Sequence, residues 1–435
     1  MPVIGFAGMT HLGLISAFAA AARGFPVFGY DEDPAVTARL QKGDIPITEP
    51  GLDGLLAAGR VRLSFAADVA TLRDCDVVYI SADVPTDDWG KSDLAPIERL
   101  IAHAARQLRD DAILVVLCQV PPGFTRALGV VPHERLIYQV ETLVFGQAVP
   151  RALNPERFIV GCADPARPLP EPYRKFLESF CCPILTMRYE SAELAKISIN
   201  FCLVGQVTVA NTLAELSEAI GADWSEIVLA LRLDRRIGAF AYLTPGLGIA
   251  GGNLERDLQT VIELGARAGT DTGVVTAWIA NSRHRKEWCW RVLETQVFAN
   301  KSMPRIAVFG LAYKENTHST KNSPSLTLLN RLRGRAELCV HDPVVPTSIV
   351  AFAAGSTDAL SCAEGADALV LATPWPEYRS LRICDLARAM RGRVLVDPFR
   401  LLPAAEAVAA GFAYHALGMP PLLQRFNEPS HAETR

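Results

Sequence analysis

The sequence predicts an α/β protein with two Rossmann-like, doubly wound domains joined by a helical middle domain that contains a long central helix. Short apolar runs alternate with helical stretches over the first 160 residues, and this alternation returns after about residue 301. Between these regions the apolar residues keep helical spacing, for more than twenty positions from Ser191 onward. Buried runs that alternate with helices are typical of a parallel sheet covered on both faces.

The length of 435 residues is too great for a single hydrophobic core. We expect three domains, at residues 1–190, 191–300 and 301–435. The net charge of −4 and the lack of a basic block argue against a nucleic-acid partner. Because no segment reaches roughly 20 uninterrupted apolar residues, we also expect no membrane partner.

The ten cysteines are scattered, with no CxxC pair and no zinc-like spacing. We therefore expect no metal site. A large chain without a disulfide pattern is typical of a reducing compartment, so the sequence predicts a cytoplasmic protein.

In the first domain, the first predicted strand runs into the turn Gly8–Gly13, which reads GMTHLG. A dinucleotide fingerprint has three glycines, but here Thr10 replaces the middle one, and its hydroxyl could face a phosphate. Asp31 ends the second strand, 23 residues after Gly8, where an acid binds the ribose hydroxyls of NAD and repels the 2′-phosphate of NADP. The alternative is an α/β turn without a cofactor. Strands are predicted at 3–8, 26–31, 76–82, 112–118 and 158–161.

Two further loops, ADVPTDDWGKSDL and CQVPPGFT, follow strands of this domain. Both place Val-Pro at the carboxyl end of a strand, where ligands bind in open α/β sheets. Thr86 and Gln119 are the candidate polar groups in these loops. Taken alone, they are equally well explained as ordinary loop residues.

The long helix carries Glu193, Lys196 and Asn200 at positions i, i+3 and i+7, so they share one helix face. A solvated face would explain this pattern. The residues around them are apolar on nearly every other side, however, and this favours a polar pocket.

Two later segments are rich in candidate ligand contacts. The loop Pro245–Asp257, PGLGIAGGNLERD, is dense in glycine, which lets a backbone approach a ligand closely. After the first strand of the third domain, Lys314 and Lys321 lie among small and polar residues. This suits phosphate binding as well as a surface turn. Strands of the third domain are predicted at 305–313, 337–343, 366–375 and 393–399.

A series of motifs runs along nearly the whole chain. In order they are EPGLDGLL, VPTDDWGKSDL, VPPG, ELAKISIN, LDRRIG, PGLGIAGGNLERD, GLAYKENT with SPS, and ADALVLATPWPEY. This ordered series resembles the UDP-glucose / UDP-N-acetylmannosamine / GDP-mannose dehydrogenase family. The resemblance implies an NAD-binding first domain, a helical middle that forms a homodimer, and a third domain that helps to bind a nucleotide-diphosphate sugar.

The resemblance also assigns roles to residues. Lys196 and Asn200 match residues that surround the reacting carbon and stabilise charge on its oxygen. Asp257 matches an aspartate that acts with an ordered water in proton transfer. Glu141 stands where the family has the Glu of its Asn-Pro-Glu-Phe-Leu segment.

Arg236 matches an arginine that can reach the sugar site of the neighbouring subunit, and Lys314 matches the substrate-side lysine. Arg400 lies near the nucleotide-contacting arginine, although the usual Gly-Arg-Asn is absent. The full assignment is catalytic Lys196, Asn200, Asp257, Asn253, Glu141 and Gln119; cofactor-binding Gly8, Thr10, His11, Leu12, Gly13, Asp31, Val84, Thr86 and Lys321; and substrate-binding Arg236, Tyr242, Gly248, Gly251, Lys314 and Arg400.

The sequence departs from the family in its catalytic loop. The family reads Gly-Phe-Gly-Gly-Ser-Cys, whereas this chain reads Gly-Ile-Ala-Gly-Gly-Asn, so Asn253 stands in the place of the cysteine. Arg256 stands in the place of a lysine. The usual Ser-Thr before Val-Pro-Pro-Gly is Cys118-Gln119 in this chain.

Family members oxidise a primary alcohol twice, and the cysteine captures the aldehyde between the two steps. Because Asn253 supplies no nucleophile, we expect an NAD-dependent two-electron oxidation of a nucleotide-diphosphate hexose. The product leaves as a carbonyl sugar, or the hydride returns to the opposite face, as in an epimerase. Cys118 or Cys202 could replace the thiol only if the fold brings it close. The alternatives are a four-electron UDP-glucose 6-dehydrogenase with a cysteine-independent second step, and a non-catalytic nucleotide-sugar-binding protein.

Overall fold

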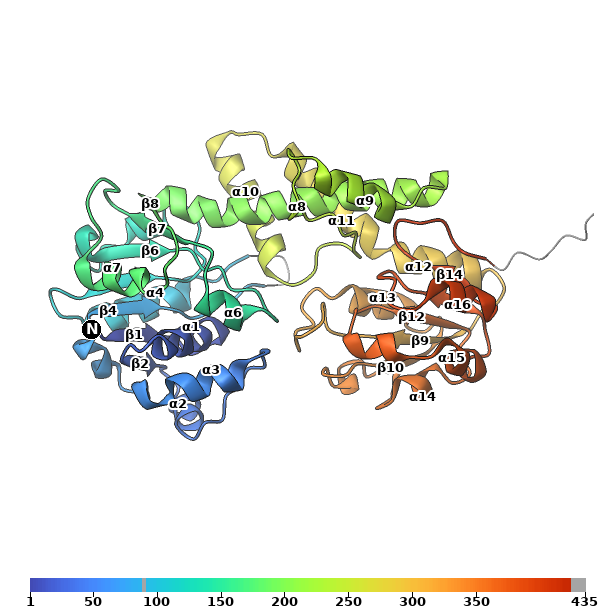
Figure 1. Ribbon diagram of the computed structural model, residues 1–435, viewed down its shortest axis with the longest axis horizontal. Coiled ribbons are helices and arrows are strands. Elements are labelled where there is room, and N and C mark those ends of the chain that lie inside the picture. Colours follow the sequence, from blue (N-terminus) through green and yellow to red (C-terminus); the bar gives the residue numbers. More distant parts are fainter. Residues whose placement is uncertain (88–90, 424–435) are drawn as a thin grey trace, which may run out of the picture. The chain divides into compact units, whose positions relative to one another are not determined.

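The computed structural model describes residues 1–87 and 91–423. The chain divides into two compact units, residues 1–200 and 201–435. The first unit is drawn in blue to green in Figure 1, and the second in green to red.

The first unit is built on an eight-stranded sheet in the order β3-β2-β1-β4-β5-β6-β7-β8. The part β3-β2-β1-β4-β5-β6 is the strand order of dinucleotide-binding doubly wound domains. Its strands are β1 Ile4–Ala7, β2 Val27–Tyr30, β3 Leu63–Ala66, β4 Val77–Ile80, β5 Ile113–Val116, β6 Leu136–Gln139, β7 Phe158–Cys162 and β8 Ile184–Arg188.

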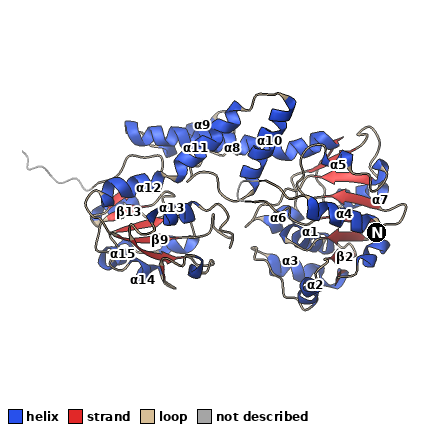
Figure 2. Cartoon of the chain, turned by 180° about the vertical axis from the view of Figure 1, so that it is seen from behind, coloured by secondary structure: helices blue, strands red, loops and turns tan. Residues whose placement is uncertain are grey.

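Helices cover both faces of this sheet, and Figure 2 shows the strands lying between them. The helices are α1 His11–Ala22, α2 Pro34–Gln41, α3 Leu52–Gly59, α4 Ala95–Ala105, α5 Phe124–Ala127, α6 Ala148–Leu153 and α7 Glu171–Glu178, with short 3₁₀ turns at Arg60–Arg62, Val69–Asp74 and His133–Arg135.

Successive residues of β4 point to opposite faces of the sheet, as the pleat requires. Val77 and Tyr79 enter a core cluster with α1, α3, α6 and α7. Val78 and Ile80 enter a second cluster with α4 and the start of the long helix α8, Tyr189–Ile220. Because both faces are buried, the strand is apolar throughout, and this is why the sequence reveals it as a continuous run.

The sequence missed three strands of this sheet, β3, β6 and β8. In addition, the predicted strand at 158–161 (β7) pairs antiparallel with β6, so the sheet is not parallel throughout. β3 and β8 lie at the two edges and are only partly buried, and each includes polar residues among apolar ones. Such edge strands lack the continuous apolar run that marks the central strands.

The second unit combines helices with a six-stranded parallel sheet in the order β11-β10-β9-β12-β13-β14. Its helices after α8 are α9 Trp224–Leu233, α10 Asn253–Ala268, α11 Gly273–Lys286, α12 Trp288–Leu293, α13 Pro324–Leu332, α14 Ala359–Ala363, α15 Ile383–Ala389 and α16 Ala404–Ala409, with a π-helical turn at Glu294–Phe298 and 3₁₀ turns at Thr347–Ile349 and Pro376–Ser380. Its strands are β9 Arg305–Phe309, β10 Glu337–His341, β11 Ala354–Gly355, β12 Ala368–Leu371, β13 Val394–Val396 and β14 Ala413–His415. The short strands β11 and β14 were not predicted.

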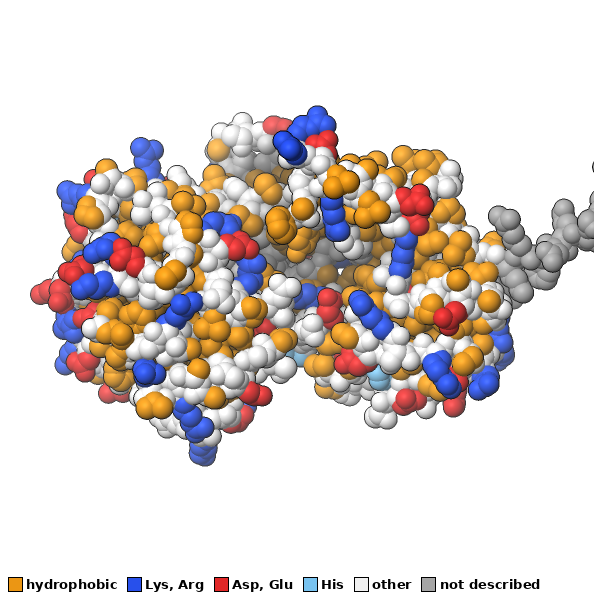
Figure 3. Space-filling view, viewed as in Figure 1, with side chains coloured by type: hydrophobic (Ala, Val, Ile, Leu, Met, Phe, Trp, Pro, Cys, Tyr) orange, Lys and Arg blue, Asp and Glu red, His pale blue; other side chains and the backbone are white. Residues whose placement is uncertain are grey.

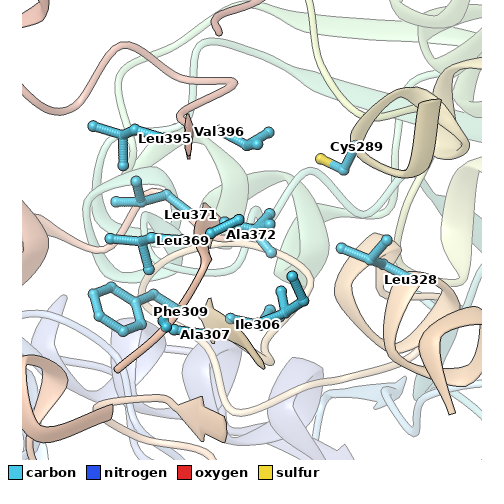
Figure 4. Packing of buried hydrophobic residues seen from close by; sticks show 14 of the residues in the cluster. Cys289, Ile306, Ala307, Phe309, Leu328, Leu369, Leu371, Ala372, Leu395 and Val396 are labelled. Carbon is cyan, nitrogen blue, oxygen red and sulfur yellow. The ribbon is translucent and has the colours of Figure 1, made fainter. Parts of the chain in front are cut away.

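One continuous hydrophobic core fills this sheet region. In Figure 4, apolar side chains of β9, β12 and β13 lie side by side, and Cys289 of α12 and Leu328 of α13 lie to one side of them. Burial of these strands on both faces explains their apolar runs in the sequence.

The two sheets repeat one local geometry. In each, a glycine with positive φ follows the first strand: φ is 95° at Gly8 and 96° at Gly310. In each, an aspartate after the neighbouring strand accepts a backbone N–H just beyond that glycine, at 2.8 Å for Asp31 and 2.6 Å for Asp342. Asp342 is buried and accepts further N–H groups, one of them from Trp375, whereas Asp31 stays half-buried just after the carboxyl end of β2. Only the acid of the first sheet therefore remains accessible to a ribose.

Helix α8 has 32 residues and confirms the long central helix that the sequence predicted. Among the described residues it is also the one helix long and apolar enough to cross a membrane, a test that core helices of soluble proteins pass as well. The absence of a membrane partner therefore stays a prediction.

Candidate active site

The turn between β1 and α1 can exist only with glycine at two positions. A Cβ on Gly8 would lie 2.5 Å from the Cβ of Ala82, and a Cβ on Gly13 would lie 1.9 Å from the carbonyl oxygen of Gly8. This brings the amino end of α1 against β1 and leaves backbone N–H groups directed at any bound diphosphate. Leu12, in the first turn of the helix, is buried in the core below.

Thr10 has a role that sequence reasoning did not anticipate. Its hydroxyl donates to the carbonyl of Ser81 (3.4 Å) and accepts from the backbone N–H of Asp83 (2.9 Å). The residue in place of the middle glycine thus connects the turn to the loop after β4. In that loop Val84 is buried, and Thr86 donates to the carbonyl of Val84 at 3.3 Å. Residues 88–90 of the same motif lie outside the described residues.

Asp31 lies at the end of β2, as the sequence predicted. One carboxylate oxygen accepts the backbone N–H of Met9 at 2.8 Å, and the other accepts that of Asp33 at 3.1 Å. These two hydrogen bonds orient the carboxylate of Asp31 toward the glycine turn.

Lys196 and Asn200 of α8 are nearly buried, with 9% and 8% of their surfaces exposed, which excludes the solvated face. The ammonium of Lys196 donates to the carbonyl oxygen of Glu141 at 2.9 Å and to its carboxylate at 3.1 Å. A buried ammonium held by a carboxylate stays available as a hydrogen-bond donor to a developing oxyanion.

Glu193, on the same face of α8, is fully buried and has a structural role. Its carboxylate accepts the backbone N–H groups of Gly123 (2.6 Å) and Thr125 (2.9 Å). Burial raises the pKa of this carboxyl, and the hydrogen bonds oppose the shift. Glu193 therefore holds the loop that follows Gln119, which is itself half-buried.

Neither of the two candidate thiols, Cys118 and Cys202, has the surroundings of a catalytic nucleophile. Cys118 is fully buried, its Sγ donates to the carbonyls of Ile80 (3.2 Å) and Ala82 (3.0 Å), and burial raises its pKa. A buried thiol of high pKa is a poor nucleophile. Cys202 is exposed on α8, two residues after Asn200 and thus about 160° around the helix from it.

The glycine-rich loop Pro245–Asp257 lies in the second unit and packs tightly. Gly248 (φ 87°) would place a Cβ 2.5 Å from the carbonyl oxygen of Ser282, and Gly251 (φ 77°) lies against the ring of Tyr313. The next residue, Gly252, packs on the aliphatic chain of Lys321, and a Cβ added to Gly252 would lie 3.2 Å from that chain. Small residues are therefore required for the loop to pass between α11 and the loop after β9.

Hydrogen bonds hold this loop in place. The backbone N–H of Ile249 donates to Ser282 Oγ at 2.8 Å, and the side chain of Asn322 donates to the carbonyl of Ile249 at 3.3 Å. The ammonium of Lys286 contacts both Asn322 and Glu255, the latter at 3.3 Å. Burial lowers the pKa of Lys286, while the carboxylate of Glu255 opposes this shift.

Two candidate catalytic residues follow at the start of α10. Asn253 is the first residue of the helix and is exposed. One turn further on, Asp257 is 2% exposed and lies 3.6 Å from the guanidinium of Arg256. Asn253 thus faces solvent, and Asp257 lies in the interior of the unit.

A cavity of about 490 Å³ opens in the second unit, and Pro245 at the start of the glycine-rich loop is one of its wall residues. Its walls are largely apolar, with charged side chains among them. They include Trp224, Val228, Leu229, Arg232, Leu243, Thr244, Pro245, Glu315, Pro374, Arg379, Pro398, Phe399, Arg400, Leu401 and Leu417. It is large enough for a ring system such as a nucleobase.

The substrate-assigned residues are not all gathered at this cavity. Arg400 lines it, but its guanidinium is paired with Asp223 at 2.8 Å. Tyr242 adjoins a wall residue and is more than half exposed. Arg236 is highly exposed and pairs with Asp234, and the ammonium of Lys314 lies 5.8 Å from the ring centre of Tyr313.

Comparisons with known proteins cover most of the chain and point to one family. Residues 3–176 match the NAD binding domain of the UDP-glucose/GDP-mannose dehydrogenase family, residues 190–283 its central domain, and residues 307–404 its UDP binding domain. A UDP-glucose 6-dehydrogenase of Pseudomonas aeruginosa is 30% identical over 443 residues, covering 95% of this chain and 96% of that protein.

The chain belongs to the UDP-glucose/GDP-mannose dehydrogenase family.

Other members of the family agree with this assignment. TuaD of Bacillus subtilis, a UDP-glucose 6-dehydrogenase, is 26% identical over 99% of this chain and 95% of its own. A UDP-glucose dehydrogenase structure from Pyrobaculum islandicum has a TM-score of 0.84 at 25% identity, covering 96% of this chain and 98% of that one. A UDP-D-ManNAc dehydrogenase structure from Pyrococcus horikoshii has a TM-score of 0.82 at 25% identity, covering 96% and 99%.

The protein is thus an enzyme of this dehydrogenase family, with NAD as its cofactor and a nucleotide sugar as its substrate. The first unit fits NAD. Gly8 and Gly13 let the backbone approach a diphosphate, and Asp31 presents a half-buried carboxylate at the ribose position.

Sequence reasoning missed several residues that hold the site. Glu193 and Lys286 were not recognised as supports for the loops that they bind, and Glu49 entered only as part of the EPGLDGLL motif. The partners of these side chains lie far away in the sequence, so no local pattern predicts the contacts. A polar face surrounded by apolar residues does indicate a buried polar group, and the face of Glu193, Lys196 and Asn200 shows this pattern.

Proposed function

We propose that the protein oxidises a carbinol carbon of a nucleotide-diphosphate hexose by two electrons, with no covalent capture of the product. The observation that carries this proposal is Asn253 at the start of α10, in the position of the family's cysteine. An amide side chain is not a nucleophile and forms no thiohemiacetal. Its N–H groups remain able to donate a hydrogen bond to a carbonyl oxygen.

The reaction balances as one hydride and one proton lost from the alcohol. NAD supplies the hydride acceptor when it is bound. Lys196, which donates from a buried position, stabilises negative charge on the sugar oxygen, and Asn200 supports it. Asp257 is assigned the transfer of the proton through water, so the products are a carbonyl sugar, NADH and a proton.

Two outcomes are open to the oxidised sugar. It leaves as an aldehyde or ketone, which makes the enzyme a dehydrogenase that reduces one NAD for each sugar oxidised. Alternatively, the hydride returns to the opposite face of the same carbon, which makes the enzyme a redox-neutral epimerase. We propose net oxidation as the primary reaction, since returning the hydride to the other face requires the sugar to reorient.

The test measures NADH and products together. The purified protein is incubated with NAD and a panel of UDP-, GDP- and ADP-hexoses, NADH is followed by absorbance, and the sugar is identified by mass spectrometry. We expect one NADH per carbonyl sugar. Two NADH per sugar with a uronic acid product would refute the single oxidation, and an altered sugar with no net NADH would select the epimerase.

A Lys196→Ala variant separates catalysis from mere binding. We expect it to lose activity while retaining affinity for NAD, because Lys196 supports the sugar oxygen and not the cofactor turn. Lys175→Ala is the matched control, since Lys175 is exposed on α7 and pairs with Glu171 of its own helix. A non-catalytic binding protein would show no turnover in the parent chain either.

We also propose that the nucleotide end of the substrate enters the 490 Å³ cavity of the second unit. The half-buried ring of Phe399 suits stacking with a base, and Arg232 and Arg379 among the lining residues suit phosphate charge. A crystal soaked with UDP would test this, and density for the base outside the cavity would contradict it.

We propose further that the protein is a homodimer. Val209, Leu213, Leu216 and Ile220 of α8 follow the spacing of one helix face, and each is at least 40% exposed. Figure 3 shows exposed hydrophobic side chains over the region of α8 and α9. Light scattering tests this: Leu216→Glu is expected to give monomers, and a monomeric parent chain would refute the proposal. A cytoplasmic location, in line with ten free cysteines, is proposed with it and is testable with a fluorescent fusion.

A further inference from the structure

Glu49 is a buried carboxylate that connects two segments of the first unit. Its side chain is fully buried, and its oxygens lie 2.9 Å from His11 Nε2, 2.9 Å from the backbone nitrogen of Gly146 and 3.3 Å from that of Ala148. Both backbone N–H groups donate to the carboxylate. Burying a carboxylate is costly unless such partners compensate for it, so the three contacts fix its position.

The first connected segment is the cofactor turn. His11 is the first residue of α1, directly after Thr10 in the GMTHLG turn. Its ring packs against Phe145, with 4.2 Å between the ring centres. His11 therefore contacts the second segment both directly and through Glu49.

The second segment is the stretch 141–148, which begins at Glu141 and ends in the first turn of α6. At its start, Glu141 holds the ammonium of Lys196. Near its end, Gly146 and Ala148 are held by Glu49. Between these two anchors the segment is not a regular helix or strand, so the anchors determine its path.

We propose that Glu49 and His11 are positioning residues that couple occupancy of the cofactor turn to the conformation of segment 141–148, and thereby to the Lys196–Glu141 pair. A diphosphate bound at the amino end of α1 restrains His11, and His11 restrains Glu49 and Phe145. The segment is then held more firmly when the cofactor is bound. The link to catalysis rests on the proposed function, but the coupling itself requires only NAD binding.

Hydrogen–deuterium exchange with NAD alone tests the coupling without any turnover. In the parent protein, saturating NAD is expected to slow exchange in peptides covering 141–148 by about tenfold, the scale of one buried hydrogen bond. Peptides covering 27–33, around Asp31, report cofactor binding independently. If NAD protects 27–33 and leaves 141–148 unchanged, the proposal is overturned.

Variants then locate the connection. In His11→Ala, measured at an NAD concentration raised until 27–33 is fully protected, NAD is expected to lose most of its effect on 141–148. His11→Gln, which retains a donor, is expected to restore part of that effect. Glu49→Gln keeps the volume and one acceptor, and should weaken the coupling without removing NAD affinity. His103→Ala, an exposed position on α4, is the control. Full NAD-linked protection of 141–148 in both His11→Ala and Glu49→Gln would overturn the proposal.

Kinetics supply a second readout that a general loss of stability would not give. We expect Glu49→Gln to lower kcat about tenfold with little change in KM for NAD, because the loss acts through Lys196 and Glu141. An unchanged kcat in an active enzyme would contradict the proposal. If the parent enzyme turns over no sugar, the proposed function fails, whereas the exchange experiment still decides the coupling.

Discussion

The buried histidine of β14 makes the stability of the second unit depend on pH, with a loss of stability in acid. His415 is 4% exposed, and among the described residues its Nε2 has no hydrogen-bond partner. Burial lowers its pKa from the ordinary value of 6.5 to about 4, and no neighbouring charge contributes to the shift. The folded chain therefore resists protonation at this ring far more than the unfolded chain does.

The sign of the effect follows from proton uptake. Between about pH 6.5 and about pH 4 the unfolded state binds the proton and the folded state does not, so the free energy of unfolding falls as the pH falls through this window. Each pKa unit corresponds to about 1.4 kcal/mol, so the loss reaches about 2 kcal/mol at pH 5 and about 3 kcal/mol below pH 4. Above pH 6.5 the histidine is neutral in both states and contributes no pH dependence.

The assay compares the parent chain with His415→Phe, whose ring stays apolar at all pH values. Urea unfolding is measured from pH 7.5 to pH 4.5, and the difference in unfolding free energy between the two chains is plotted against pH. Other titrating groups are common to both chains and cancel. We expect this difference to shift in favour of the variant by about 2 kcal/mol on acidification to pH 5. Parallel curves would refute the reasoning.

Further predictions concern the glycine turn, the catalytic loop and its support. Gly13→Ala should weaken NAD binding at least about tenfold in a calorimetric titration, because the new methyl group collides with the turn and displaces α1. Gly54→Ala, which meets no atom within 4 Å, should leave it unchanged. Asn253→Cys should raise the yield of NADH toward two per sugar, and a yield that stays at one would show that position 253 does not limit the second oxidation. Lys286→Met should lower kcat about tenfold and speed hydrogen exchange in the loop Pro245–Asp257, since it frees Glu255.

The sequence predicted most of the central strands of both sheets, because these strands are buried on two faces and read as apolar runs, as β4 and β12 do. It did not predict β6, although this strand is central and fully buried. It predicted the long helix α8 from its spacing. It did not predict β3, β8 or β14, which lie at sheet edges and are short or only partly buried. An edge strand is less covered by the rest of the protein, so polar residues are tolerated in it and its apolar run is weaker.

By itself, the sequence determined the fold class, the family and the cofactor, because these depend on local patterns: a glycine turn after a strand, an acid at the end of the next strand, and motifs in a fixed order. The tertiary structure decided what individual side chains do. Glu193 supports a loop, and the thiol of Cys118 is buried and hydrogen-bonded. Glu49 binds His11, which lies 38 residues before it, and Gly146, which lies 97 residues after it. Burial and hydrogen bonding depend on partners that folding brings together. These partners lie far apart in the chain, so no short local pattern reveals them.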